Sequence, residues 1–372
     1  MKKNITESKS PRRGSEREKQ PLELTIGVDL GDKSSRYCIL DREGKVLLER
    51  SIATSKKGLA QAFASMGASR IAIEVGTHSP WIKRLLESWN HEVIVANARR
   101  VKLISESTRK DDRLDARTLA RLARVDPQLL SPIRHRNETA QGHLVMIRAR
   151  AALVEVRTKL VNSARGLTKS MGERLSNCDA DQMSANRLAG LPAALQEALQ
   201  PLMTIVEAVT LQIHHYDKKI GQIARREYPE AARLQQVKGV GDLIALSFVL
   251  TLDDPQRFHR SRDVGGFLGL RPKRRDSGES RPQLRITKEG DPYLRKLLVQ
   301  GAQYILGWRG PDTDLRRWGL KLVARGGKNA KKRAVVAVAR KLAVLLHRLW
   351  ITGQPYEPLR HSRAASSSPV AA

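Results

Sequence analysis

The stretch LELTIGVDLG, residues 22–31, decides the fold of the N-terminal part of the chain. Its apolar residues alternate with other residues, and it ends in an acid and a glycine, as a strand does where it leaves a core for a loop. Two more alternating segments follow, SSRYCILD at 34–41 and KVLLERSI at 45–52, joined by the turn residues REG. Together the three segments predict an antiparallel meander.

The pattern changes after the meander. GLAQAFASMG at 58–67 and WIKRLLESW at 81–89 have helical spacing, whereas RIAIEVG at 70–76 and HEVIVAN at 91–97 are short apolar runs typical of buried strands. A strand, a helix and a second strand in this order predict a parallel crossover. A meander continued by parallel units is the order of the ribonuclease-H-like α/β fold, which we predict for residues 21–135.

Strand patterns are absent from the next predicted segment, residues 136–228. Apolar residues recur there at steps of three and four in 143–172 and 195–228, with Arg and Lys between them. This spacing predicts two long helices in a coiled-coil-like, all-α segment. The helices can pair as an antiparallel hairpin within one chain or contribute to a dimer.

The last predicted domain, residues 229–353, is mainly helical. RLQQVKGVGDLIALSFVLTL at 233–252 resembles a helix-hairpin-helix motif, whose turn at Gly239 and Gly241 would present backbone N–H groups to a phosphate. A glycine-rich turn between two ordinary helices is the alternative. Helical spacing returns in PYLRKLLVQGAQYIL and KKRAVVAVARKLAVLLHRLW.

Both ends of the chain are predicted to be disordered tails. Residues 1–20 are crowded with Lys, Arg, Glu and Ser, and residues 354–372 end in AASSSPVAA. The N-terminus has no apolar core for a signal peptide, and no apolar run reaches the ~18 residues of a spanning helix. Cys38 and Cys178 have neither a disulfide framework nor a zinc spacing. We therefore expect a cytoplasmic protein with reduced thiols.

The charge of the chain points to a polyanionic partner. Its 372 residues include 68 Lys and Arg against 38 Asp and Glu, a formal charge of +30 and a pI of about 10.7. Such a surface repels itself unless counterions or phosphates cover it. Nucleic acid is therefore the expected partner, and a membrane is not.

Carboxylates gather at a few positions of this basic chain. Asp29 ends the first predicted strand and Glu74 ends the fourth, and these strands are neighbours in a ribonuclease-H-like sheet. RKDDRLDA at 109–116 adds Asp112 and Asp115, which share one face of a helix. Carboxylates that converge are stabilised by a hard divalent ion such as Mg²⁺, and two such ions can clamp a DNA phosphodiester. Asp111 is adjacent, but the three-residue step to Asp115 favours Asp112.

The motifs GVDLG, IAIEVGTHSPW, KDDRLDA, GLRPKRRDSG and RITKEGDPYLRKLLVQGA occur in this order. They resemble the DEDD-type insertion-sequence transposases, which join a RuvC-like domain to a serine-bearing transposase domain; the resemblance covers about residues 22–350. It implies a site-specific DNA recombinase that uses Mg²⁺ or Mn²⁺ at Asp29, Glu74, Asp112 and Asp115. This chain departs from the family pattern at Asp111, where family members usually have a small polar residue.

The resemblance also implies a covalent mechanism and a guide. The motif serine of the family falls on Ser277, which would be the nucleophile that attacks DNA. Family members bind a structured bridge RNA that pairs with donor and target DNA, so the protein would contact mainly backbone. A homo-oligomer, either a dimer or a tetramer, is also expected. The expected nucleic-acid contacts, besides Gly239 and Gly241, are Arg148, Arg150, Arg157, Lys159, Arg165, Lys169, Arg271, Lys273, Arg274 and Arg275.

Other classes of protein fit the sequence less well. A metal-dependent RuvC-like endonuclease would use the same carboxylates without the serine. A tyrosine recombinase would use His259 and Arg262 with Tyr293 or Tyr304, but it leaves the N-terminal acids unexplained. A sugar-kinase or actin-like ATPase shares Asp-x-Gly after a strand but needs a second phosphate loop. A non-catalytic scaffold would not need all four acids.

Overall fold

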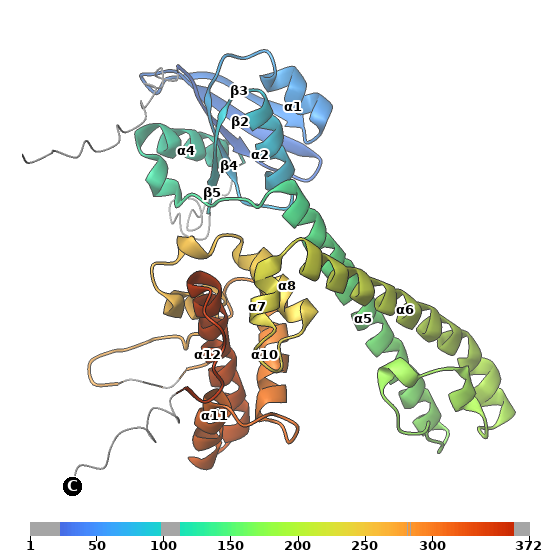
Figure 1. Ribbon diagram of the computed structural model, residues 1–372. Helices are drawn as coiled ribbons and strands as arrows, with labels where there is room; N and C mark the ends of the chain where they lie inside the picture. Colours follow the sequence, from blue (N-terminus) through green and yellow to red (C-terminus); the bar gives the residue numbers. More distant parts are fainter. Residues whose placement is uncertain (1–22, 98–111, 281, 283, 361–372) are drawn as a thin grey trace, which may run out of the picture. The chain divides into compact units, whose positions relative to one another are not determined.

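The computed structural model describes residues 23–97, 112–280, 282 and 284–360 (Figure 1). The predicted tail 1–20 and residues 361–372 of the second tail lie outside these ranges, as does Asp111. The chain divides into two compact units, Met1–Arg136 and Asn137–Ala372. Each unit is described separately below.

The first unit contains a five-stranded mixed sheet. Its strand order is β3-β2-β1-β4-β5. β1 pairs antiparallel with β2, and β2 with β3, whereas β4 is parallel to both β1 and β5. The predicted meander, the parallel continuation and the adjacency of the first and fourth strands are therefore confirmed. The strands are β1 (Thr25–Asp29), β2 (Ser34–Leu40), β3 (Val46–Ala53), β4 (Arg70–Glu74) and β5 (Glu92–Ala96).

Helices cover both faces of the sheet. α1 (Lys56–Phe63) and α2 (Ser79–Ser88) lie over one face and form a core with strand residues that include Ile26, Val28, Ile71 and Ile73. α4 (Asp112–Val125) lies over the other face, where its Ala and Leu side chains pack against β1, β2, β4 and β5 (Figure 1). Alternation along each strand therefore divides its residues between two cores.

A glycine lets α4 lie directly on the central strand. A Cβ atom on Gly27 would lie 2.0 Å from the carbonyl oxygen of Ala116 and 2.5 Å from the amide nitrogen of Ala120. No side chain fits in that space, because both neighbours are backbone atoms that belong to a helix. Gly27 thus fixes the distance between β1 and α4.

The second unit begins with two long helices, α5 (Glu138–Ser170) and α6 (Ala193–Arg226). They run side by side (Figure 1). Arg150 of α5 contacts Asp217 of α6, and Arg157, further along α5, contacts Thr210, which comes earlier in α6. Because the residue numbers of the contacting pairs rise along α5 and fall along α6, the two helices are antiparallel. Two short 3₁₀ turns, Ala180–Gln182 and Ala185–Leu188, lie in the connection between them.

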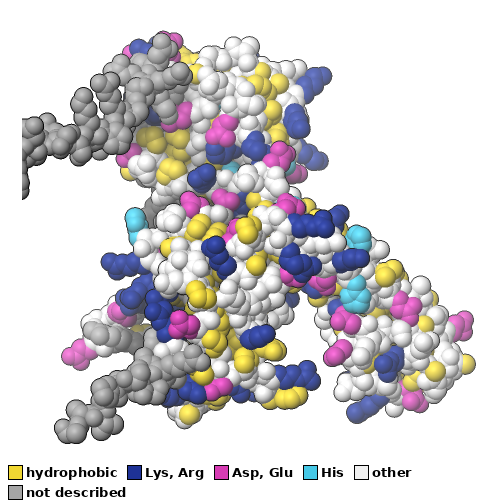
Figure 2. Space-filling view, viewed as in Figure 1, with side chains coloured by type: hydrophobic (Ala, Val, Ile, Leu, Met, Phe, Trp, Pro, Cys, Tyr) yellow, Lys and Arg dark blue, Asp and Glu magenta, His cyan; other side chains and the backbone are white. Residues whose placement is uncertain are grey.

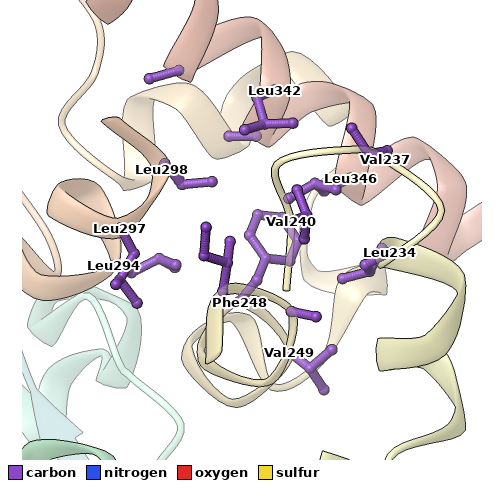
Figure 3. Close-up of a cluster of buried hydrophobic side chains, with 14 of the residues drawn as sticks. Leu234, Val237, Val240, Phe248, Val249, Leu294, Leu297, Leu298, Leu342 and Leu346 are labelled. Carbon is purple, nitrogen blue, oxygen red and sulfur yellow. The ribbon is translucent and has the colours of Figure 1, made fainter. Parts of the chain in front are cut away.

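The helices after α6 enclose an apolar core, to which α5 and α6 contribute residues such as Ile147 and Ile220. α8 is buried along most of its length, and Figure 3 shows Phe248 among leucine and valine side chains from α7, the following turn, α10 and α12. The predicted helix 292–306 is present with the same bounds. The helices are α7 (Pro229–Leu234), α8 (Asp242–Leu252), α9 (Val264–Phe267), α10 (Pro292–Leu306), α11 (Asp314–Ala324) and α12 (Ala330–Thr352).

The segment 354–360 packs on this helical core, although the sequence pattern assigned it to a tail. The Tyr356 amide donates to the Gln236 side chain at 2.7 Å, and the Asp314 amide donates to the Pro358 carbonyl at 2.8 Å. Tyr356 also packs against the core. These contacts come from distant residues, which local periodicity does not reveal, and the disordered tail stays a prediction. No helix within the described ranges has the length and apolar character needed to span a membrane.

Candidate active site and nucleic-acid-binding residues

The carboxylates Asp29 and Glu74 occupy equivalent positions on neighbouring strands. Val28 of β1 pairs with Ile73 of β4 in parallel register, so the next residue of each strand is the acid. Adjacent strands lie about 4.8 Å apart. The two carboxylates therefore leave the same edge of the sheet, side by side.

Strand alternation directs both acids to the face of the sheet that α4 covers. Asp29 is two residues after Gly27, whose missing side chain makes room for α4. Glu74 is two residues after Ala72, which is buried with Leu119 of α4. The opposite face, with Val28 and Ile73, belongs to the core under α1 and α2.

The direction of α4 brings its first turn to the same edge. Near its end, the Ala123 carbonyl accepts a hydrogen bond from Arg70, the first residue of β4, at 3.2 Å. Ala116 lies against Gly27, so the helix runs antiparallel to β1 and β4. The four residues from Ala116 back to Asp112 span about 6 Å of helix. The two residues from Gly27 to Asp29 span about 6.6 Å of strand, which puts the start of α4 level with Asp29.

Asp115 lies in the first turn of α4, half-buried, and so joins the edge with Asp29 and Glu74. The side chain of Asp112 lies outside the described atoms, so the fourth carboxylate of the predicted set has a backbone position only. Among the side chains that are described, no cluster of three or more His, Cys, Asp or Glu residues is close enough to hold a metal ion. The donor set itself, all carboxylate oxygens, is the type that Mg²⁺ and Mn²⁺ prefer.

A histidine that sequence reasoning missed lies in the loop after β4. His78 Nε2 is 3.4 Å from Asp32, in the loop after β1, and Trp81 Nε1 donates to His78 Nδ1 at 3.2 Å. Because Nδ1 accepts a hydrogen bond, Nε2 carries the proton in the neutral ring. The signal was the run THSP at 77–80, separated from Glu74 by two residues, since loops after parallel neighbouring strands meet at one edge.

A second histidine holds the same loop. The hydroxyl of Ser79 contacts His135 Nε2 at 2.9 Å and also binds the amide and carbonyl of Gly76. Burial, with the nearby cations of Lys83 and Arg136, lowers the pKa of His135 to about 4. His135 is therefore neutral at physiological pH and acts as a structural hydrogen-bonding group.

Ser277 lies at the tip of a β-hairpin in the second unit. It exchanges two backbone hydrogen bonds with Ser280, of 3.2 and 3.0 Å, around Gly278, which has a φ of +55°. The Ser277 side chain and its neighbours in the hairpin are exposed. The hairpin is also closed at its base, where the Lys273 amide donates to the Arg285 carbonyl at 2.9 Å. A DNA backbone can reach this tip without displacing a core.

The four predicted cations near Ser277 are not equivalent. Arg271 pairs with Asp263 at 2.9 Å, which ties the hairpin base to the helical core. Lys273, Arg274 and Arg275 are exposed and closer in sequence to the serine. These three are better placed to meet a phosphate than Arg271, and contact of all four with nucleic acid stays a prediction.

The arginines of α5 are engaged within the second unit. Arg148 pairs with Asp291 and lies 4.8 Å from the ring centre of Tyr293, Arg150 binds both Asp217 oxygens at 2.6 and 3.0 Å, and Arg165 donates to the Cys178 carbonyl at 2.8 Å. Arg157 is 8% exposed and pairs with Asp181. These contacts join α5 to its neighbours. A surface role for Arg157 would require the helix pair to open, because its guanidinium is buried.

Lys159 and Lys169, in contrast, are exposed on α5. Figure 2 shows Lys and Arg side chains spread over the visible face of both units. Phosphate contact by Arg148, Arg150 and Arg165 stays a prediction and would require each to share or exchange its protein partner. The lysines need no such exchange.

The glycine turn predicted at Gly239 and Gly241 links α7 to α8. Gly239 has a φ of +95°, and Gly241 directly precedes α8. The first-turn carboxylate of α8, Asp242, is engaged by Arg225 at 3.1 Å and Gln235 at 2.8 Å. These features fit a helix-hairpin-helix and an ordinary glycine-rich turn alike, and contact of the turn with phosphate stays a prediction.

The tyrosine of the alternative recombinase class is engaged elsewhere. Burial raises the pKa of Tyr293, the Arg148 guanidinium lies 4.8 Å from its ring centre, and Arg150 hydrogen-bonds to its side chain. A tyrosine nucleophile needs the opposite, a phenol whose proton is easily lost. This environment does not favour Tyr293 as a nucleophile.

Comparison with known proteins gives the family. A transposase model of the DEDD type of IS110 matches residues 26–171, and one described as the transposase IS116/IS110/IS902 family matches residues 231–316. The transposase for insertion sequence element IS1111A of Coxiella burnetii is 28% identical over 339 residues, covering 89% of this chain and 90% of that relative. The transposase for IS1328 of Yersinia enterocolitica is 27% identical over 334 residues, covering 87% and 95%.

A third relative, a probable family 20 transposase of Pseudomonas aeruginosa, is 26% identical over 341 residues and covers 90% of this chain and 98% of its own length. The similarity thus extends through both units rather than through one motif. The N-terminal match contains the strand ends and the start of α4, and the C-terminal match contains the Ser277 hairpin. The chain belongs to the DEDD-type transposases of insertion sequences and is an enzyme that acts on DNA.

Proposed function

We propose that this transposase cuts and rejoins DNA as a site-specific recombinase, with divalent ions at Asp29, Glu74, Asp112 and Asp115 and with Ser277 as the nucleophile. The first unit would be a RuvC-like domain of the ribonuclease-H-like fold at 21–135. The segments 136–228 and 229–353 would form the helical connection and the transposase domain.

The antiparallel course of α4 across β1 and β4 carries the metal proposal. It brings the first turn of α4, with Asp115, to the edge where Asp29 and Glu74 emerge. The chain has a formal charge of +30, so a group of acids at one edge forms a region distinct from the basic surface. The acids would bind metal ions, and the basic surface would bind nucleic acid. Bound Mg²⁺ or Mn²⁺ would stabilise the charge that develops on the phosphate oxygens during transfer.

The residues themselves have distinct tasks in this proposal. Asp29 and Glu74, on rigid strands, would fix the positions of the ions, and Asp115 would complete the set from α4. His78 lies in the loop after β4, and its Nε2 would orient a water or a phosphate oxygen there only by giving up its contact with Asp32.

Ser277 would transfer a DNA strand to itself and then away again. Its Oγ bonds to the phosphorus while the bond from phosphorus to one deoxyribose oxygen breaks, the hydroxyl proton leaves to a base, and the departing oxygen gains a proton. The phosphodiester energy is kept in the serine ester, so a second strand can replace the serine without ATP. The exposed hairpin tip and three exposed cations support this role.

A structured guide RNA and a dimer or tetramer complete the proposal. The RNA would choose donor and target by base pairing, and the protein would hold its backbone through exposed cations such as Lys159 and Lys169. An RNA-guided complex predicts that binding to RNA, like binding to DNA, falls linearly with salt on a logarithmic scale.

The decisive experiment traps the covalent complex. Labelled DNA that carries the ends of the element is incubated with protein, RNA transcribed from the flanking sequence, and Mg²⁺, then denatured and digested for mass spectrometry. We expect an adduct on the peptide that contains Ser277, absent from Ser277→Ala and present in Ser280→Ala, a matched variant of the same turn. Cleavage with free ends and no adduct would instead support a metal-dependent endonuclease.

A further inference from the structure

An indole ring is exposed in the turn that ends α10. Trp308 is 83% exposed, although its turn is fixed by hydrogen bonds. The Gly310 amide donates to the Gly307 carbonyl at 3.1 Å, and Arg316 donates to the carbonyls of Ile305, at 2.8 Å, and Gly307. Trp308 is thus a large apolar side chain held in water on a rigid support, where it contributes little to the core.

A cation lies against this ring. The guanidinium of Arg309 is 4.4 Å from the ring centre of Trp308. An arginine stacked on one face of an indole leaves the other face available, and it brings a positive charge beside an aromatic surface. That combination matches the two parts of a nucleotide, a flat base and a charged phosphate.

A second exposed aromatic ring, Tyr304, lies four residues earlier in the chain, in α10. Tyr304 is 45% exposed and lines a groove of about 520 Å³ together with Lys238, Gly241 and Gln300. A Cβ atom on Gly239 would be 3.0 Å from the Tyr304 ring, so the glycine lets the turn after α7 pack on the tyrosine. The groove thus joins an aromatic surface to a turn with a lysine at its edge.

These groups fit an unpaired nucleotide better than a duplex. In duplex DNA the base faces are covered by neighbouring bases, so a protein meets mainly backbone. An unpaired base offers a free face, and stacking on aromatic side chains beside a positive groove is how proteins hold single strands. Because the family acts on DNA, an unpaired nucleotide of the DNA substrate is the occupant that the chemistry favours.

We propose that Trp308, with Arg309, binds an unpaired nucleotide of the DNA substrate, and that the groove of Tyr304 and Lys238 serves the same strand. The base stacks on the indole ring, and its phosphate lies beside the Arg309 guanidinium. The site goes beyond the proposed function, and it depends on DNA as the substrate but not on the serine or the metal. Binding measured without divalent ions therefore tests this site separately from the proposed cleavage.

The test measures binding of the full chain to fluorescein-labelled oligodeoxythymidylate and to its duplex with oligodeoxyadenylate, by anisotropy and without divalent ions. Trp308→Ala weakens single-strand binding by about 5- to 100-fold, the range that the loss of one base stack gives. Duplex binding stays unchanged. Trp308→Phe keeps most of the affinity, and Leu211→Ala, at an apolar position of α6 that is 67% exposed, keeps all of it.

A second measurement reports stacking directly. An oligonucleotide with one 2-aminopurine loses fluorescence when that base stacks on a ring, and Trp308→Ala restores part of the signal. Equal losses on single strand and duplex, or no loss on either, would overturn the proposal. So would a change of mass in light scattering that accompanies the loss, since Trp308 would then join copies of the chain. With oligouridylate as a third labelled probe, a loss confined to that probe would make RNA the partner and overturn the assignment to DNA.

Discussion

The sheet edge and the Ser277 hairpin carry the residues proposed for one chemistry, but they are built in opposite ways. Asp29 and Glu74 each end a strand whose preceding residues are buried on both faces of the sheet. Gly27 sets the distance from β1 to α4. Ser277 lies on an exposed turn closed by two backbone hydrogen bonds. Metal ligands require fixed spacing, whereas a nucleophile that enters a DNA backbone requires access. The comparison predicts that substitutions at the edge disturb structure and chemistry together, and those at the hairpin disturb chemistry alone.

The largest effect expected at the edge is on cleavage. Asp29→Asn keeps the size of the side chain but removes a charge, so cleavage of the element's ends should fall at least about 100-fold, because ion stabilisation of the transition state is worth several kcal/mol. Single-turnover assays with Mg²⁺ measure this. Glu92→Gln, at the opposite end of the same sheet and paired with Arg70, is the control. Normal cleavage by Asp29→Asn would remove β1 from the active site.

The second effect tests whether the edge depends on packing. Gly27→Ala forces a methyl group against the Ala116 carbonyl, so α4 must move, and the free energy of unfolding should fall by about 2–3 kcal/mol. Urea unfolding measures the loss. Gly67→Ala, where no heavy atom lies within 4 Å of the added Cβ, should change stability by less than about 0.5 kcal/mol. Equal stability of the two variants would show that the contact between β1 and α4 is looser than described.

The third effect separates structural from exposed cations on α5. Arg157→Ala removes a buried guanidinium and should cost about 1–2 kcal/mol of stability, since Asp181 keeps much of its hydration. Lys159→Ala should leave stability unchanged, weaken RNA or DNA binding, and lower the slope of log affinity against log salt by about 1. Thermal unfolding and salt titrations compare the two. A reduced slope in Arg157→Ala with unchanged stability would contradict this division.

The fourth effect concerns pH at the sheet edge. The pKa of His135 falls from about 6.5 when unfolded to about 4 when folded, so the unfolded state binds the proton more readily in this range. Its contribution to stability is complete above about pH 6.5 and is lost as pH falls toward 4. Urea midpoints at pH 7.5, 5.5 and 4.5 should fall more in the wild type than in His135→Gln. Parallel curves would show that other groups govern the acid response.

The strands were predictable because their signals are local. Alternation in 25–29 and 34–40 and the apolar runs around 70–74 and 92–96 determine strands, and short turns then leave few ways to pair them. The adjacent positions of Asp29 and Glu74 could be predicted from these strands, because neighbouring parallel strands end at one edge. The link between His78 and Asp32 did not follow, since it joins loops 46 residues apart whose side-chain directions depend on packing.

By itself, the sequence determined the order of strands and helices, the basic character and the positions of the acids, because hydrophobic period and charge are properties of the chain. Only the tertiary structure decided which charges are available. Arg157 and Lys159 are two residues apart on one helix, but one faces α6 and is buried, and the other faces solvent. Trp308 similarly has a large apolar side chain of the kind found in protein cores, yet it lies in a turn that leaves this side chain exposed. Burial depends on contacts between segments distant in sequence, and those contacts exist only after the chain has folded.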